Sequence, residues 1–134
     1  MNVCFTVPGK PQGKARPRFT RSGHTYTPGS TAAYEERVKL AYRQAGGGKL
    51  SGFVSADILA VFAAPKSYTK AQRTAALNAS FASKKPDCDN IAKIILDALN
   101  GLAYDDDAQV VKLRVEKRYG MTDHVTVTLE GGES

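Results

Sequence analysis

The six aspartates between positions 87 and 107 are the residues of this sequence whose spacing is best suited to chemistry. Asp87 and Asp89 stand just before a predicted helix, and Asp105, Asp106 and Asp107 follow it. In an extended D-x-D segment the two side chains point the same way, so their carboxylates crowd one face unless a cation lies between them. Hard divalent ions such as Mg²⁺ or Mn²⁺ prefer such oxygen ligands. We therefore predict a metal site that holds Asp87, Asp89 and a carboxylate of the triplet.

The predicted helix, about residues 90–100, limits how the third carboxylate can reach this site. Such a helix advances the chain by roughly 16 Å, and residues 101–107 span about 20 Å when extended. The triplet can therefore return to the start of the helix with little slack. The alternative is that Asp87 or Asp89 caps the helix, whose N-terminus favours negative charge. Capping accounts for one aspartate but not for two. We expect the side chain of Cys88, which stands between them, to point into the core.

Lys93 lies four residues after Asp89 and four before Asp97, so the three side chains share one face of the predicted helix. These residues can form two surface ion pairs, each worth a few tenths of a kcal/mol. They can also place a lysine beside the metal, where it contacts the scissile phosphate or stabilises the charge that develops on it. The spacing alone leaves both interpretations open.

The sequence does not contain several other metal-binding and catalytic motifs. Counted from Asp87, an EF-hand would need glycine and glutamate at positions that hold Ala92 and Ala98. The sequence has no G-x-x-x-x-G-K loop and no G-x-S-x-G motif, and it has only two histidines.

The net charge of +6 is unevenly distributed, because the first 50 residues carry +7 and the remaining 84 carry −1. The loop 8–28 concentrates cations on a backbone stiffened by proline, and arginine forks match phosphate oxygens. Phe19 and Tyr26 can stack on unpaired bases. The alternative is an ordinary solvated charged loop. We predict DNA contacts from this loop and from the pair of lysines before Asp87, namely from Lys10, Lys14, Arg16, Arg18, Arg21, Lys84 and Lys85.

The hydrophobic pattern predicts a single α+β domain over residues 1–134, with helices on one face of a mixed sheet. The order is β-α-β-α-α-β-β, with the strands and helices expected at about 3–7, 31–45, 54–63, 69–76, 90–100, 110–119 and 125–129. Its functional parts are the basic loop 8–28, the catalytic helix region 84–101 and the acidic turn 105–107. The tail 131–134 is expected to fray.

A membrane role is not expected. The longest apolar run, Ile58 to Ala64, has seven residues, whereas a spanning helix needs about 20. The N-terminus lacks the pattern of a signal peptide, and we interpret the two cysteines as reduced thiols. These features favour a cytoplasmic protein.

Three separated blocks resemble the RusA-type Holliday-junction resolvases, a family of endodeoxyribonucleases. The blocks are Lys85-Pro86-Asp87-Cys88-Asp89-Asn90-Ile91-Ala92-Lys93, then Asp97-Ala98-Leu99-Asn100-Gly101, and then Asp106-Asp107-Ala108-Gln109-Val110-Val111. At the N-terminus, Lys14-Ala15-Arg16-Pro17-Arg18 and Tyr26-Thr27-Pro28 are similar to bacterial and phage members.

The resemblance implies a small homodimeric endonuclease of mixed α/β fold that acts in DNA recombination and repair, in a phage, a prophage or a bacterium. Such an enzyme depends on Mg²⁺, for which Mn²⁺ can substitute, binds four-way DNA junctions and nicks two strands symmetrically. By resemblance, Asp87, Asp89 and Asp107 match the essential carboxylates, Lys93 matches the essential lysine, and Asp106 is the partner acid and a further metal ligand. Asp105 precedes the family pattern and stays outside the catalytic set. No membrane partner and no small-molecule cofactor are implied.

Two alternatives remain at this point. One is a nuclease that prefers other branched DNA, such as flaps or forks. The other is a catalytically silent DNA-binding protein with the same fold.

Overall fold

The structure is a computed structural model that describes residues 1–15, 18–19, 21–23, 25–26, 29–79 and 81–133. Its elements in chain order are β1 (Asn2–Pro8), β2 (Arg18–Phe19), β3 (Thr25–Tyr26), α1 (Gly29–Gln44), β4 (Leu50–Ala63), α2 (Lys70–Ala79), α3 (Cys88–Ala98), the short 3-10 helix η1 (Asp107–Gln109), β5 (Val110–Gly120) and β6 (His124–Glu133). The fold class and the order of the main elements confirm the sequence prediction.

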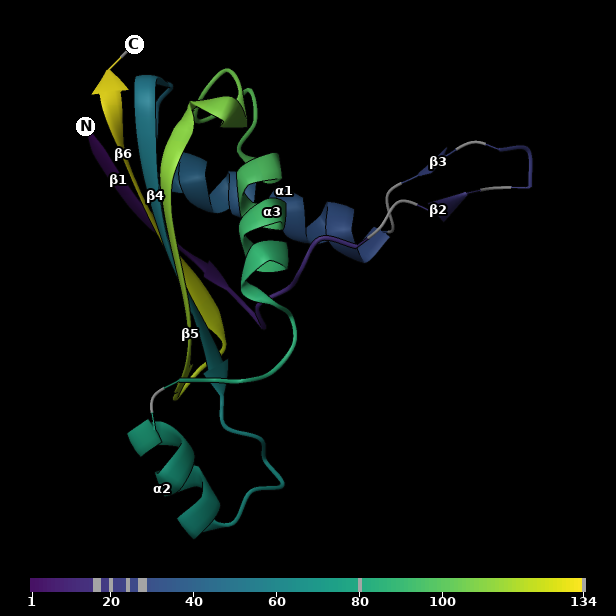
Figure 1. Cartoon of the computed structure of the whole chain (residues 1–134), viewed down its shortest axis with the longest axis vertical. Coiled ribbons are helices and arrows are strands. Elements are labelled where there is room, and N and C mark those ends of the chain that lie inside the picture. The colour runs from purple at the N-terminus through teal and green to yellow at the C-terminus, as the bar shows by residue number, and fades with distance from the viewer. Residues whose placement is uncertain (16–17, 20, 24, 27–28, 80, 134) are drawn as a thin grey trace.

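The main sheet has the strand order β1-β6-β4-β5 (Figure 1). β6 pairs antiparallel with β1 and with β4, whereas β4 and β5 are parallel. A parallel pair requires a crossover connection, and α2 and α3 supply it. Alternation sets the buried face of the sheet: Val3, Phe5 and Val7 are buried in β1, while the residues between them are exposed.

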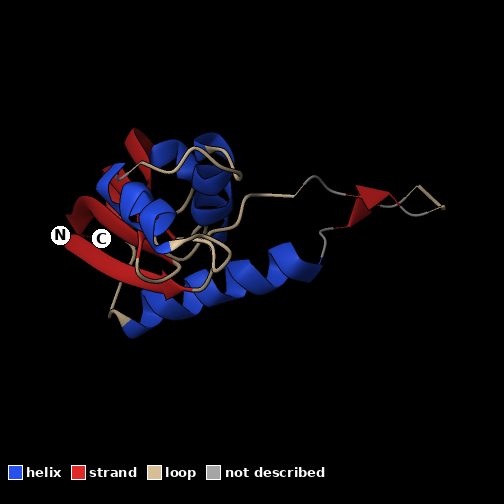
Figure 2. Cartoon of the chain, turned by 90° about the horizontal axis from the view of Figure 1, so that it is seen from below, coloured by secondary structure: helices blue, strands red, loops and turns tan. Residues whose placement is uncertain are grey.

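Helices α1 and α3 cover one face of the sheet, and the core lies between them and the strands (Figures 1 and 2). The helix α3 presents Ile91, Ile94 and Ile95 to this core, all with 0% of their surface exposed. The helix α2 stands away from the body, and the β2–β3 ribbon projects beyond the start of α1 (Figures 1 and 2). None of the described helices combines the length and the apolar character needed to cross a membrane.

The largest differences from the predicted boundaries are in β4 and at the end of β6. The strand β4 starts at Leu50, four residues before the expected start, and contains an irregularity between Ser51 and Ser55. The expected fraying of the tail is wrong for its described residues, because Gly132 pairs with Ser51 and Glu133 pairs with Leu50. The basic loop 8–28 also contains the short antiparallel β2–β3 pair, which is consistent with a hairpin in this segment.

Candidate active site and nucleic-acid interface

Asp87 and Asp89 lie at the start of α3 with their carboxylates exposed. Asp87 occupies the N-cap position, yet its side chain makes no capping hydrogen bond. Its carboxylate instead pairs with the Lys85 ammonium at 3.0 Å. Among the described residues, Asp89 has no hydrogen-bond or ion-pair partner. Helix capping by these side chains therefore does not explain the D-x-D pair.

The prediction that Cys88 points into the core is wrong. Cys88 is exposed, and its sulfur lies 3.9 Å from the carbonyl oxygen of Val115. The physical reason is the start of the helix: the first turn of α3 is solvated, and the buried stripe begins only at Ile91.

The acidic turn 105–107 lies beyond the other end of α3 (Figure 1). The backbone N–H of Asp107 donates to the Asn100 side-chain oxygen at 2.8 Å. Asp106 caps η1 by accepting from the Ala108 N–H at 3.4 Å. Asp105 is exposed and pairs with Lys49 at 2.8 Å. Each aspartate of the triplet thus has a different local role.

Gln109 holds the acidic turn in place. Its side-chain oxygen accepts from the Asp105 N–H at 2.8 Å and from the Asp106 N–H at 3.3 Å. Its side-chain nitrogen donates to the Gly52 carbonyl at 3.0 Å, which ties the turn to β4. The sequence contains a signal for this positioning role, because Gln109 stands three residues after Asp106 with the spacing of a capping box.

The pKa of the Asp107 carboxyl is raised from its usual value. Desolvation is the first cause, and the hydrogen bond and negative charge of Asp106 add to it. The charge of Asp97 also raises this pKa, whereas the hydrogen bond with Asn100 lowers it. The turn therefore concentrates negative charge beside the end of α3.

Within one chain the predicted carboxylates do not gather around one point. Asp87 and Asp89 precede or begin α3, Asp107 lies beside Asn100, and an 11-residue helix is about 16 Å long. In the described part of the chain, no group of three or more His, Cys, Asp or Glu side chains is placed to hold a metal ion. As placed here, these residues do not fit a single Mg²⁺ site, and their assignment as ligands stays a prediction.

Lys93 and Asp97 form an ion pair of 3.4 Å on the exposed face of α3. The same Asp97 oxygen lies 3.4 Å from the Lys14 ammonium, which also pairs with Glu35 of α1 at 3.0 Å. Lys93 keeps 62% of its side chain exposed, but Lys14 keeps only 19%. Lys93 is therefore the cation of this network that remains accessible to a ligand.

Lys14 fastens the start of the basic loop to the body. Its backbone N–H donates to the Asn90 carbonyl at 3.2 Å, and its side chain joins α1 to α3 through Glu35 and Asp97. Partial burial lowers the pKa of Lys14, but the hydrogen bonds and charges of the two carboxylates outweigh it, and the pKa is raised. These contacts give Lys14 a structural role that the charge of the loop does not reveal.

Replacing Lys14 by methionine is expected to lower the free energy of unfolding by about 1–2 kcal/mol, between the values for exposed and buried pairs. The salt dependence of DNA binding is expected to stay unchanged. Urea unfolding and binding titrations at several salt concentrations measure both effects, with Lys10→Met as the matched control. A reduced salt slope together with unchanged stability would assign Lys14 to phosphate instead.

Two hollows that share Lys84 are lined by five lysines in total. The first, of about 300 Å³, is lined by Ser83, Lys84, Lys85, Asp87 and Lys117. The second, of about 290 Å³, is lined by Lys10, Ala63, Ala64, Pro65, Lys66, Lys84 and Asp123. Three of the predicted DNA-binding residues, Lys10, Lys84 and Lys85, therefore lie together, joined by the unforeseen Lys66 and Lys117.

The remaining predicted DNA contacts lie in the basic loop. Arg21 is exposed in the turn between β2 and β3. Arg16 and the side chain of Arg18 lie outside the described residues. Their assignment to DNA stays a prediction.

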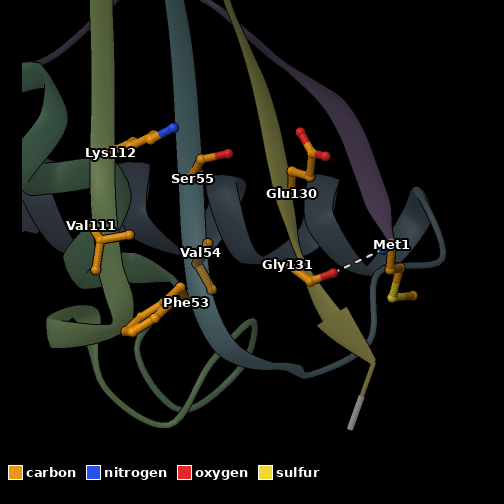
Figure 3. A pocket seen from close by; sticks show the side chains of 8 residues that line it. All are labelled: Met1, Phe53, Val54, Ser55, Val111, Lys112, Glu130 and Gly131. Atoms are coloured by element: carbon orange, nitrogen blue, oxygen red, sulfur yellow. Dashed lines mark hydrogen bonds between the residues drawn. The ribbon is translucent and has the colours of Figure 1, made fainter.

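A wider hollow of about 500 Å³ lies elsewhere, on β4, β5 and β6 (Figure 3). Its lining includes Phe53, Val111, Lys112 and Glu130 and none of the predicted site residues. We therefore place the candidate active site at the aspartates and the cations of the two basic hollows. The hollow of Figure 3 has a larger volume but contains none of the predicted site residues.

Comparison with known proteins bears on this assignment. The family model described as Endodeoxyribonuclease RusA matches residues 8–130. The chain belongs to the RusA endodeoxyribonuclease family. The match contains all three sequence blocks of the resemblance and confirms it. A curated relative, the uncharacterized protein YqaN of Bacillus subtilis, is 36% identical over 134 residues, covering 95% of this chain and 94% of YqaN.

The aspartates, Lys93 and the residues that line the two basic hollows all lie within the matched residues 8–130. The residue roles within this RusA-family protein remain predictions.

Proposed function

We propose that this RusA-family protein is a divalent-metal-dependent endonuclease that resolves four-way DNA junctions by nicking two strands symmetrically. The observation that carries the proposal is the D-x-D pair at the start of α3. Asp87 and Asp89 are exposed, and the Asp87 side chain makes no capping hydrogen bond to the helix. The pair stands beside a hollow lined by three lysines. Two carboxylates repel phosphate, whereas the lysines around them attract it. This combination is typical of a site that cleaves phosphodiesters.

Lys93 is the proposed cationic group at the reacting phosphate. Its ammonium is exposed and fixed by Asp97, which is itself held by Lys14. An ammonium in this position attracts the phosphate and stabilises negative charge as it develops there. Lys84 and Lys85 neutralise neighbouring phosphates and orient the strand.

Mg²⁺ is the proposed cofactor, with Mn²⁺ as a substitute. Asp87, Asp89, Asp107 and Asp106 are its proposed ligands through the family resemblance. Such an ion, when bound, would supply an activated water and stabilise negative charge on the phosphate. Within one chain the described residues do not bring these carboxylates together around one point.

We further propose that the protein acts as a homodimer, because two symmetric nicks require two sites and a two-fold axis matches that of the junction. Exposed apolar side chains support self-association. Val111 and Leu113 on β5 are 55% and 48% exposed, and Phe53 on β4 is 81% exposed. β5 lies at the edge of the main sheet, where strands readily meet another chain.

The function is tested with a labelled four-way junction, a linear duplex and a flap, each incubated with Mg²⁺ or with chelator. An excess of unlabelled duplex suppresses salt-sensitive non-specific binding. The expected result is paired nicks at symmetric positions of the junction alone, which disappear with chelator. Cleavage of flaps in preference to junctions would favour the other branched-DNA nuclease, and binding without cleavage would favour a silent DNA-binding protein.

A further inference from the structure

Lys117 occupies a position on β5 where the alternation of the strand places apolar side chains. It pairs across the sheet with the buried Ala60, just as Val115 pairs with the buried Ile58. A charged side chain on such a face needs polar partners. Lys117 is half-buried, so its ammonium cannot be treated as an ordinary surface charge.

The polar partners of Lys117 are backbone carbonyls of the segment that leads to Asp87. Its ammonium donates to the carbonyl oxygen of Lys84 at 2.8 Å and to that of Pro86 at 3.4 Å. An ammonium carries three N–H donors, so one of them is left for a further acceptor. Lys117 is thereby fixed in position while it keeps capacity to bind an anion.

The start of the same segment is also fastened to β5. Phe81 forms an antiparallel bridge with Arg118, and the Ala82 N–H donates to the Lys117 carbonyl at 2.9 Å. The Arg118 guanidinium lies 4.6 Å from the centre of the Phe81 ring. Residues 81–86 are therefore held at both ends, and the first basic hollow that they border has a fixed wall.

Charge is unbalanced in this hollow. Three lysines line it, Lys84, Lys85 and Lys117, against the single carboxylate of Asp87. Lys85 pairs with Asp87 at 3.0 Å, which leaves the charges of Lys84 and Lys117 without a carboxylate among the lining residues. The Lys84 ammonium lies 5.2 Å from the centre of the Phe62 ring, which supplies no negative charge. Like charges at one hollow repel each other unless an anion lies between them.

We propose that this hollow binds a phosphodiester group of the DNA strand, next to the group that lies at Asp87, with Lys117 as its fixed donor. This inference rests on the proposed function for its DNA substrate and adds the residue and the subsite. Lys84 also lines the second hollow, together with Lys10 and Lys66, so the lysines continue from one hollow to the next. A row of positive charges of this kind favours a polymer of phosphates over a single carboxylate as the ligand. The strand would follow the two hollows toward the start of α3.

The first experiment measures the affinity for a four-way junction in chelator over a range of salt concentrations. Lys117→Met removes the charge and both carbonyl contacts, whereas Lys117→Gln removes the charge and keeps N–H donors. Each phosphate contact contributes about 0.9 to the slope of log affinity against log salt. Both variants are expected to lower that slope by about 0.9 and to weaken binding about tenfold at low salt.

The control is Lys112→Met, a lysine of the same strand that is exposed and lies at the separate hollow of Figure 3. It is expected to keep the wild-type slope. An unchanged slope in both Lys117 variants would overturn the subsite. Absence of salt-dependent junction binding by the wild-type protein would instead overturn the proposed function, so the two failures are distinguishable.

A second measurement needs no variant and therefore does not depend on their folding. Inorganic phosphate is titrated into the wild-type protein, with chloride at equal ionic strength as reference, and backbone amide shifts are followed by NMR. The amides of Ser83, Lys84 and Lys85 are expected to shift, and those of Phe53 and Lys112 to stay. Shifts that are equal throughout the chain, or absent from these three residues, would contradict an anion site here.

Discussion

Asp87→Asn is expected to reduce cleavage of a four-way junction by about 1,000-fold or more, the scale seen when an essential catalytic group is removed. Asparagine keeps the shape of the side chain but removes the charge that a hard cation prefers. Binding of the junction is expected to persist or to strengthen, because a repulsive negative charge beside Lys85 is lost. The measurement is a single-turnover cleavage rate with Mg²⁺, together with the dissociation constant in chelator.

The matched control is Asp105→Asn. Asp105 is also an exposed aspartate, but it pairs with Lys49 at 2.8 Å and lies outside the family pattern. Its variant is expected to cleave within about twofold of the wild-type rate, as is usual for a surface change. Equal losses in both variants would mean that general charge, and not the D-x-D pair, controls cleavage. A fully active Asp87→Asn protein would remove Asp87 from the site.

Lys93→Met is expected to lower the single-turnover rate by about 100–1,000-fold, the cost of losing one group that stabilises developing charge. The fold is expected to survive, because Asp97 keeps its second partner, Lys14, at 3.4 Å. The ion-pair interpretation predicts a different result, namely a loss of a few tenths of a kcal/mol in stability and no change in rate. Rate and thermal stability measured on the same sample separate the two interpretations.

Lys39→Met provides the comparison for Lys93→Met. Lys39 forms an ion pair of the same kind on α1, with Glu36 at 3.2 Å, and lies outside the predicted site. This variant is expected to keep the wild-type rate. If Lys93→Met behaves in the same way as Lys39→Met, the catalytic assignment of Lys93 is wrong.

Local alternation was sufficient to predict β1 and β6, because the sheet buries every second residue of each strand. The end of β6 was mispredicted for a physical reason. Terminal residues commonly fray, and this is why the sequence alone predicts a frayed tail at 131–134. In the fold, a Cβ on Gly132 would lie 2.9 Å from the Ser51 carbonyl oxygen. Glycine is needed there for close approach to β4, which no local pattern reveals.

The position of the acidic turn depends on side-chain contacts that the sequence leaves open. Chain length allows residues 101–107 to return to the start of α3. The Asn100 side chain instead accepts the Asp107 N–H at 2.8 Å, and the Tyr104 hydroxyl donates to the Leu96 carbonyl at 2.7 Å. These bonds keep the turn at the far end of the helix.

The basic residues show the same limit of sequence analysis. Composition correctly indicated a cationic surface, but it could not assign partners. Lys14 belongs to an internal network with Glu35. Lys117 lies beside the segment that leads to Asp87, although its strand has the regular alternation of an ordinary half-buried strand. Both outcomes depend on contacts between residues more than 20 positions apart, and charge counts along the chain contain no information about them.

Symmetric resolution of a DNA junction can be measured with a supercoiled plasmid that extrudes a cruciform. A dimer that cuts both strands during one binding event converts the plasmid directly to a linear product, whereas single nicks release the supercoiling and yield open circles. We expect linear product from the first time point with Mg²⁺, and none with chelator or with Asp87→Asn. Open circles alone, or equal cutting of a plasmid without the cruciform, would contradict the account.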